Sequence, residues 1–177
     1  MFTIDADDFC ETNTDWDRLA SIKRRNPDFR ITLFTVPGLC STDFISRMME
    51  YEWLELAPHG WLHKTARECE HWTLNEARRC LELVEPFGMA RIFKAPGWQI
   101  SDDTYRALIE FGYTVADQSY NDGRRPSELK SYILGPQSIH GHIGHMGGRN
   151  DNALEFIEPT LLSVECETVG EYLKRTG

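Results

Sequence analysis

"RITLFTVPGLCSTDFISRMMEYEWLELA", residues 30–57, is the stretch that indicates the fold class. Residues 30–36 form a β-rich apolar run closed by a Pro-Gly pair, which is typical of a buried strand. Residues 41–51 predict a helix with a serine or threonine cap, and residues 53–57 predict a second strand. A strand, a helix and a strand with short connectors indicate an α/β fold with a mainly parallel sheet.

The same alternation continues on both sides of this unit. Further strands are predicted at residues 1–6, 90–95, 113–117, 131–134 and 138–143, with a last strand at 160–164. Helices are predicted at residues 14–26, 73–84, 101–111 and 168–175. A doubly wound open sheet and a (β/α) barrel both fit, and the glycine-rich nucleotide-binding motifs are absent. A full eight-unit barrel needs about 250 residues, so an irregular or incomplete (β/α) barrel is favoured.

Length and composition bound the possible functions. The 177 residues suffice for one domain, 1–177, with a single core. The formal charge of −9 disfavours nucleic acid as a partner. No apolar run approaches the roughly 18 residues of a membrane helix, and no secretory leader is expected, so we expect no membrane partner. Five scattered cysteines without C-x-x-C spacing favour reduced thiols and a cytoplasmic location.

Polar residues follow the predicted strands one after another. In parallel α/β folds the carboxyl ends of the strands share one edge, where ligands bind, so we expect these side chains to converge. They are Asp7, Asp8, His59, His63, Lys94, Pro96-Gly97-Trp98, Asp117, His140 and His142.

The convergence suggests a metal site. His59 and His63 are four residues apart, a familiar spacing for two metal ligands on one helical face. Two imidazoles and a carboxylate form a catalytic-zinc ligand set that leaves a position for water. Neighbouring residues of an extended chain point in opposite directions, so one of Asp7 and Asp8 could bind metal while the other acts as base. With a histidine as proton donor, the arrangement predicts metal-assisted hydrolysis of an ester or amide.

Five motifs, "TIDADDF", "HGWLH", "FKAPGW", "VAD" and "IHGH", resemble in this order those of the polysaccharide deacetylase family with the NodB homology domain. The resemblance covers about residues 2–145 and is closest to small members from bacteria and phages. It implies a distorted (β/α) barrel that removes acetyl groups from N- or O-acetylated sugars. It also implies one divalent metal, zinc first, with cobalt, manganese or nickel as alternatives.

The resemblance also implies roles for the first two motifs. Asp7 resembles the family's catalytic base, and Asp8 resembles its carboxylate metal ligand. His59 and His63 match the two histidine ligands. Asp5 is a rival carboxylate in "DADD", but its position within a strand favours a core hydrogen-bonding role.

The later motifs supply the remaining roles implied by the resemblance. Lys94 stands where the family has arginine, and the backbone N–H of Gly97 would stabilise the oxyanion. Asp117 resembles the acidic residue of the fourth motif. His142 matches the late histidine that acts as general acid, with His140, two residues earlier, as the alternative.

Two tryptophans and three departures bear on the substrate. Trp61 and Trp98 flank the expected pocket, where aromatic rings suit a sugar, although tryptophans are also common in cores. Gly60 replaces the usual serine or threonine, Lys94 lacks the planar fork of arginine, and the fourth motif lacks its tryptophan.

Three functions are therefore considered, of which a metal-dependent deacetylase of an acetylated sugar or related small molecule leads. The first alternative is a weak or inactive protein of this fold that binds carbohydrate. The second is a metal hydrolase of another non-peptide C–N bond. Substrate and oligomeric state are left open by the sequence.

Overall fold

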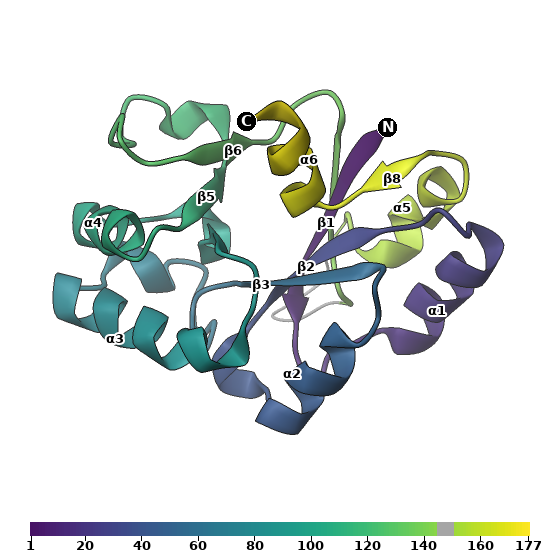
Figure 1. The fold of residues 1–177 in the computed structure, drawn as a ribbon, viewed down its shortest axis with the longest axis horizontal. Helices are drawn as coiled ribbons and strands as arrows, with labels where there is room; N and C mark the ends of the chain where they lie inside the picture. Colours follow the sequence, from purple (N-terminus) through teal and green to yellow (C-terminus); the bar gives the residue numbers. More distant parts are fainter. Residues whose placement is uncertain (145–150) are drawn as a thin grey trace.

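The computed structural model describes residues 1–144 and 151–177 of a chain that alternates strands and helices (Figure 1). The strands are β1 (Phe2–Phe9), β2 (Ile31–Thr35), β3 (Leu54–Pro58), β4 (Ile92–Lys94), β5 (Thr114–Asp117), β6 (Ser131–Ile133), β7 (Ser138–His142) and β8 (Cys166–Glu167). The helices are α1 (Trp16–Arg25), α2 (Thr42–Met49), α3 (Leu74–Val84), α4 (Asp102–Glu110), α5 (Leu154–Leu161) and α6 (Val169–Thr176).

All pairings between these strands are parallel, in two connected sheets. One sheet has the order β3-β2-β1-β7, and β8 pairs with the start of β1. The second sheet has the order β4-β5-β6. A parallel bridge between His59 and Lys94 links the end of β3 to the end of β4. The result is a curled parallel sheet that forms an incomplete (β/α) barrel, which confirms the predicted fold class (Figure 1).

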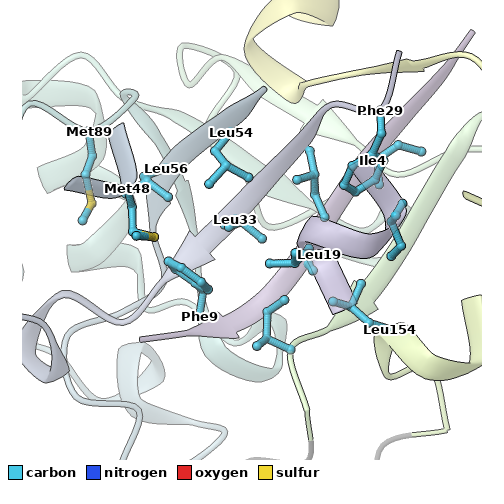
Figure 2. Close-up of a cluster of buried hydrophobic side chains, with 14 of the residues drawn as sticks. Ile4, Phe9, Leu19, Phe29, Leu33, Met48, Leu54, Leu56, Met89 and Leu154 are labelled. Atoms are coloured by element: carbon cyan, nitrogen blue, oxygen red, sulfur yellow. The ribbon is translucent and has the colours of Figure 1, made fainter. Parts of the chain in front are cut away.

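The main hydrophobic core lies between the larger sheet and helices α1, α2 and α5. Ile4 of β1, Leu33 of β2 and Leu19 of α1 are fully buried in it. Figure 2 shows these side chains together with Leu54 and Leu56 of β3. All five residues of β2 are buried, and a strand covered on both faces reads as a mainly apolar run. A second cluster packs α3 and α4 against β4 and β5.

Side-chain caps fix the starts of four helices in the described part of the chain, α2, α3, α4 and α6, and the cap of α2 is the predicted one. The hydroxyl of Ser41 accepts a hydrogen bond from the backbone N–H of Phe44, and Ser101 caps α4 in the same way. Thr73 and Glu76 form a capping box at the start of α3. These bonds satisfy N–H groups that the first helical turn leaves without a partner.

One predicted strand, at residues 160–164, is wrong. This segment overlaps the end of helix α5, and the last strand is β8 instead. Leu154 and Leu161, seven residues apart, are both buried, which is a helical spacing. A short apolar run alone does not separate a strand from a buried helix segment.

Two further properties of the described residues concern the environment of the protein. The five cysteines are free thiols, and all except Cys40 are buried. Among residues 1–144 and 151–177, no helix has the length and hydrophobicity needed to span a bilayer.

Candidate active site

Strand β1 brings three buried carboxylates to one edge of the sheet. Asp5 and Asp7 point to the same face because they are two residues apart in a strand. Asp8 has a φ of 68°, and the pairing with β2 shifts register between Ala6 and Phe9. This left-handed residue interrupts the pleat, so Asp7 and Asp8 do not point in opposite directions as the sequence predicts.

Both neighbouring carboxylates instead approach the same imidazole. The Nε2 atom of His59 lies 3.8 Å from Oδ2 of Asp7 and 3.6 Å from Oδ1 of Asp8. The Nε2 atom of His63 lies 3.2 Å from the same oxygen of Asp8. Asp8, His59 and His63 thus form a group whose ligand atoms lie within 4.8 Å of one another. The predicted carboxylate and two histidines come together.

His59 and His63 lie on a loop rather than on one face of a helix. His59 directly follows β3, and its backbone N–H donates to the carbonyl of Thr35 at 2.7 Å. Gly60 and His63 then adopt φ values of 60° and 51°, which turn the chain back on itself. The two rings end with their centroids 5.1 Å apart. Two residues in the left-handed conformation, rather than a helical turn, therefore bring the two imidazoles together.

The protonation states in this group favour a cation. Burial lowers the pKa of His59 from 6.5 to about 4, so its imidazole is neutral at pH 7. Its Nδ1 atom lies 3.0 Å from the carbonyl oxygen of Lys94, which leaves Nε2 to face the carboxylates. Burial also raises the pKa of Asp8, whose Oδ1 accepts no hydrogen bond within the described part of the chain. A buried oxygen in this state requires a partner, and a bound metal would provide one.

Lys94 occupies the centre of a buried charge network. Its side chain is completely buried, and Nζ lies 2.6 Å from Oδ1 of Asp5 and 2.7 Å from Oδ1 of Asp7. The same ammonium lies 4.6 Å from the ring centroid of Phe34 and 4.2 Å from that of Trp98. Burial alone would raise the pKa of Asp7, but Lys94 and the neighbouring imidazoles together hold it well below its usual range.

The two late histidines stand beside this network on β7. Nδ1 of His140 lies 2.7 Å from Oδ1 of Asp5, and its Nε2 lies 3.8 Å from Oδ2 of Asp7. Nδ1 of His142 lies 2.7 Å from Oδ1 of Asn152, which leaves its Nε2 for other contacts. Asp7, His140 and His142 form a second group with ligand atoms within 4.8 Å. The ammonium of Lys94 beside Asp7 makes that second group a poorer cation site than the first.

The loop after β4 covers the network. Gly97 has a φ of 58°, and a Cβ at this position would lie 2.2 Å from the carbonyl oxygen of Ala66. Only glycine therefore fits this turn without a shift of the backbone. Trp98 places its ring edge-on to His140, with centroids 5.4 Å apart. The aromatic ring thus lies beside His140 and Lys94, and a role of Trp98 in substrate binding stays a prediction.

Trp61 lies in a different environment. It packs against the main hydrophobic core and lines a cavity of about 440 Å³ together with Trp72. A role of Trp61 in substrate binding stays a prediction.

Asp117, at the end of β5, takes part in a hydrogen-bond network with its own loop. It is fully buried, and its Oδ2 accepts a hydrogen bond from Arg125 at 2.8 Å. Its Oδ1 accepts bonds from the backbone of Gln118 and from the side chain of Asn121. Asn121 in turn donates to the carbonyl of Trp98 at 3.0 Å. Asp117 therefore helps to hold the loop of Trp98, and its predicted catalytic role stays a prediction.

Asp5 hydrogen-bonds in the core as expected, to Lys94 and His140, and its spacing from Asp7 is the signal that both share one face. Sequence reasoning missed two other residues that position the site. Asn152 and Glu68 carried no signal, because each acts through contacts that only the folded loops create.

Comparisons with known proteins identify similar folds. No protein-family model and no curated protein matches the chain. The Xyl-CE4 domain of a multidomain xylanase, from the hindgut metagenome of Trinervitermes trinervoides, superposes with a TM-score of 0.65. It is 14% identical, over 99% of this chain and 90% of that one.

Two other solved structures bear on catalysis. A family 4 acetyl xylan esterase from Clostridium thermocellum, in complex with a cobalt ion, gives a TM-score of 0.60 at 14% identity. That match covers 98% of this chain and 90% of the other. A CE4 family pseudoenzyme from Bacillus anthracis gives 0.62 at 13% identity, over 98% of this chain and 65% of that one. The chain thus has the fold of CE4 carbohydrate deacetylases and esterases, a fold that active enzymes and pseudoenzymes share.

Proposed function

We propose that the protein is a divalent-metal-dependent hydrolase that removes an acetyl group from an N- or O-acetylated sugar or a related small molecule. The observation that carries the proposal is the approach of Asp8, His59 and His63 within 4.8 Å of one another. Beside them stands Asp7, a carboxylate held ionised by Lys94. A ligand set and an adjacent base are what hydrolysis of an acetyl group requires.

The residues of the first group fit a divalent metal. A buried carboxylate oxygen without a hydrogen-bond partner in the described residues faces two imidazole nitrogens. A carboxylate and two histidines suit zinc and leave a coordination position open. Cobalt, manganese and nickel are the alternatives, and the similar esterase from Clostridium thermocellum holds a cobalt ion. When bound, the metal would polarise the acetyl carbonyl and acidify a water molecule.

Asp7 is proposed as the general base. Its Oδ2 lies 3.8 Å from the Nε2 atoms of both His59 and His140. Lys94 contacts the other oxygen and keeps the carboxylate ionised at neutral pH, so Oδ2 is the atom that would accept a proton from the attacking water. A lysine at this position supplies charge without the two-point grip of an arginine.

His142 is proposed as the general acid. Its Nδ1 is held by Asn152, so the proton to be donated would reside on Nε2. His140 is less suited, because Nδ1 is bonded to Asp5 and Nε2 lies within 3.8 Å of the base. An imidazole in that position would exchange protons with Asp7 more readily than with the leaving group.

The loop after β4 is proposed to hold the substrate. The backbone N–H of Gly97 would donate to the developing oxyanion, a contribution that grows as negative charge forms there. The ring of Trp98 offers an apolar face to a sugar. Solved structures of the same fold include enzymes named for xylan and chitin, which favours an acetylated carbohydrate. We also place the protein in a reducing, cytoplasmic compartment because its cysteines are free.

A carbohydrate-binding protein without activity is the second candidate. The CE4 pseudoenzyme from Bacillus anthracis shares this fold, so the fold alone does not require catalysis. Retention of both a base and a complete ligand set favours the enzyme. Hydrolysis of another non-peptide C–N bond is the remaining alternative.

Elemental analysis tests the metal site first. The wild-type protein should bind about one divalent metal per chain, and a His59→Ala/His63→Ala double variant should bind none. His71→Ala is the control, because His71 lies on the surface with 75% of its side chain exposed. No metal in the wild-type protein after incubation with zinc, cobalt, manganese and nickel would refute the metal-dependent enzyme.

Acetate release then tests catalysis. Asp7→Asn should retain the metal and lose about 10²- to 10⁴-fold in turnover of acetylated chitin or xylan oligomers. Unchanged turnover would exclude Asp7 as the base. Binding of the oligomers without acetate release by the wild-type protein would favour the inactive binding protein.

A further inference from the structure

The loop that carries His63 has no regular secondary structure to hold it. Between β3 and the short 3-10 turn Glu68–Glu70, the chain turns at Gly60 and again at His63, both with positive φ. A non-glycine residue in this conformation is unfavourable by about 1–2 kcal/mol, so other contacts must hold it. Yet Nε2 of His63 must lie near Asp8 for the proposed metal site to form.

One carboxylate holds three consecutive amides of this loop. Oε2 of Glu68 accepts hydrogen bonds from the backbone N–H of Trp61 at 3.2 Å and of His63 at 2.9 Å. Oε1 accepts a third from Leu62 at 3.0 Å. A concave run of N–H groups around an anion is a strong and specific arrangement. Glu68 is itself anchored, since its neighbour Cys69 is fully buried in the second hydrophobic cluster.

Gly60 provides the space for this carboxylate. A Cβ added at Gly60 would lie 2.6 Å from Oε2 of Glu68 and 3.0 Å from the ring of Pro96. Gly60, between the two histidines, and Glu68, five residues beyond His63, are therefore complementary parts of one turn.

We infer that Glu68 is a positioning residue that holds the loop of residues 61–63 so that His63 faces Asp8. The inference rests on the proposed function, because it assigns His63 as a metal ligand. Glu68 acts through the backbone of the loop, because its carboxylate accepts hydrogen bonds from the main-chain N–H groups of residues 61–63. Mutation of a residue that orients a metal-binding side chain commonly lowers the metal affinity by about 10- to 100-fold.

Glu68→Gln is the test variant, with Glu70→Gln as the matched control. Glutamine keeps the shape but offers one acceptor oxygen, so its NH₂ group would face at least one of the three backbone N–H donors. Glu70 lies on the same short turn, but its carboxylate pairs with Arg67 at the surface. If Glu68→Gln does not fold, Glu68→Asp keeps two acceptor oxygens on a shorter side chain and serves in its place.

Two measurements decide the role of Glu68. Titration of the metal-free proteins with Co²⁺ should give a binding constant about 10- to 100-fold weaker in Glu68→Gln, with altered visible absorption of the bound ion. Amide hydrogen exchange at residues 61–63, measured without metal, should be at least about tenfold faster. Glu70→Gln should match the wild type in both. Wild-type affinity, absorption and exchange in Glu68→Gln would overturn the inference.

The failure of the proposed function would look different. A wild-type protein that binds no Co²⁺ would refute the metal site. Amide exchange would then decide on Glu68 alone, since faster exchange in Glu68→Gln would support its hold on the loop and unchanged exchange would overturn it.

Discussion

Replacement of Lys94 by methionine should strongly destabilise the metal-free protein. Lys94 is fully buried, and its ammonium is the cation that neutralises two buried carboxylates, Asp5 and Asp7. Methionine fills similar space but leaves both charges without this partner. Loss of one member of a buried pair typically lowers stability by about 3–5 kcal/mol. With an unfolding entropy of about 2.1 cal/mol/K per residue, the melting temperature should fall by about 10 °C.

Urea unfolding at pH 7 in the presence of EDTA measures this loss directly. Lys130→Met is the control, because Lys130 is exposed and its change should alter stability by less than about 0.5 kcal/mol. Addition of Asp5→Asn to Lys94→Met should recover part of the stability, because one of the two unpaired charges is removed. A loss below about 1 kcal/mol, or no recovery in the double variant, would refute the account of the network.

Three further predictions concern single groups. The pKa of His59 is lowered from 6.5 to about 4, so between these two pH values the imidazole is protonated in the unfolded chain but not in the folded chain. The stability of the metal-free protein should therefore fall by about 3 kcal/mol between pH 6.5 and 4 in urea unfolding, and His59→Gln should remove much of this slope. Gly97→Ala should lower the free energy of unfolding by at least about 2 kcal/mol, because Gly97 has a φ of 58° and an added Cβ would lie 2.2 Å from a backbone oxygen. The control Gly123→Ala, which has open space around the added Cβ, should unfold like the wild type in urea. Arg125→Met should lower the free energy of unfolding by about 2–3 kcal/mol, because it removes the cation that pairs with the buried carboxylate of Asp117. Its Co²⁺ affinity should equal that of the wild type, and a large loss of affinity would contradict a purely structural role of this pair.

The sequence predicts the framework because local patterns determine it. The apolar runs of β2 and β3, with a capped helix between them, define a parallel unit without reference to any distant residue. Given parallel strands, residues that follow successive strands must meet, and the structure does bring Asp7, Asp8 and His59 together.

The details of the site depend on contacts that no local pattern encodes. The pairing of Asp117 with Arg125, eight residues away, could not be read from a motif in which the same aspartate has another role. The left-handed turn at Asp8 is also invisible in the sequence, because only a few per cent of such residues adopt it. The short segment before β8 contains an apolar run that fits either secondary structure until its neighbours are known.

The bridge between His59 and Lys94 has a mechanical consequence. It joins the two sheets where β3 and β4 meet, together with the hydrogen bond from the N–H of Ala90 to the carbonyl of Leu56. Separation of the sheets would therefore pull the imidazole of His59 away from the backbone carbonyl of Lys94, 3.0 Å from its Nδ1. By linkage, anything that binds through His59 and holds it in place also resists this separation. Ligand binding at His59 and the stability of the junction between the two sheets are thus thermodynamically coupled.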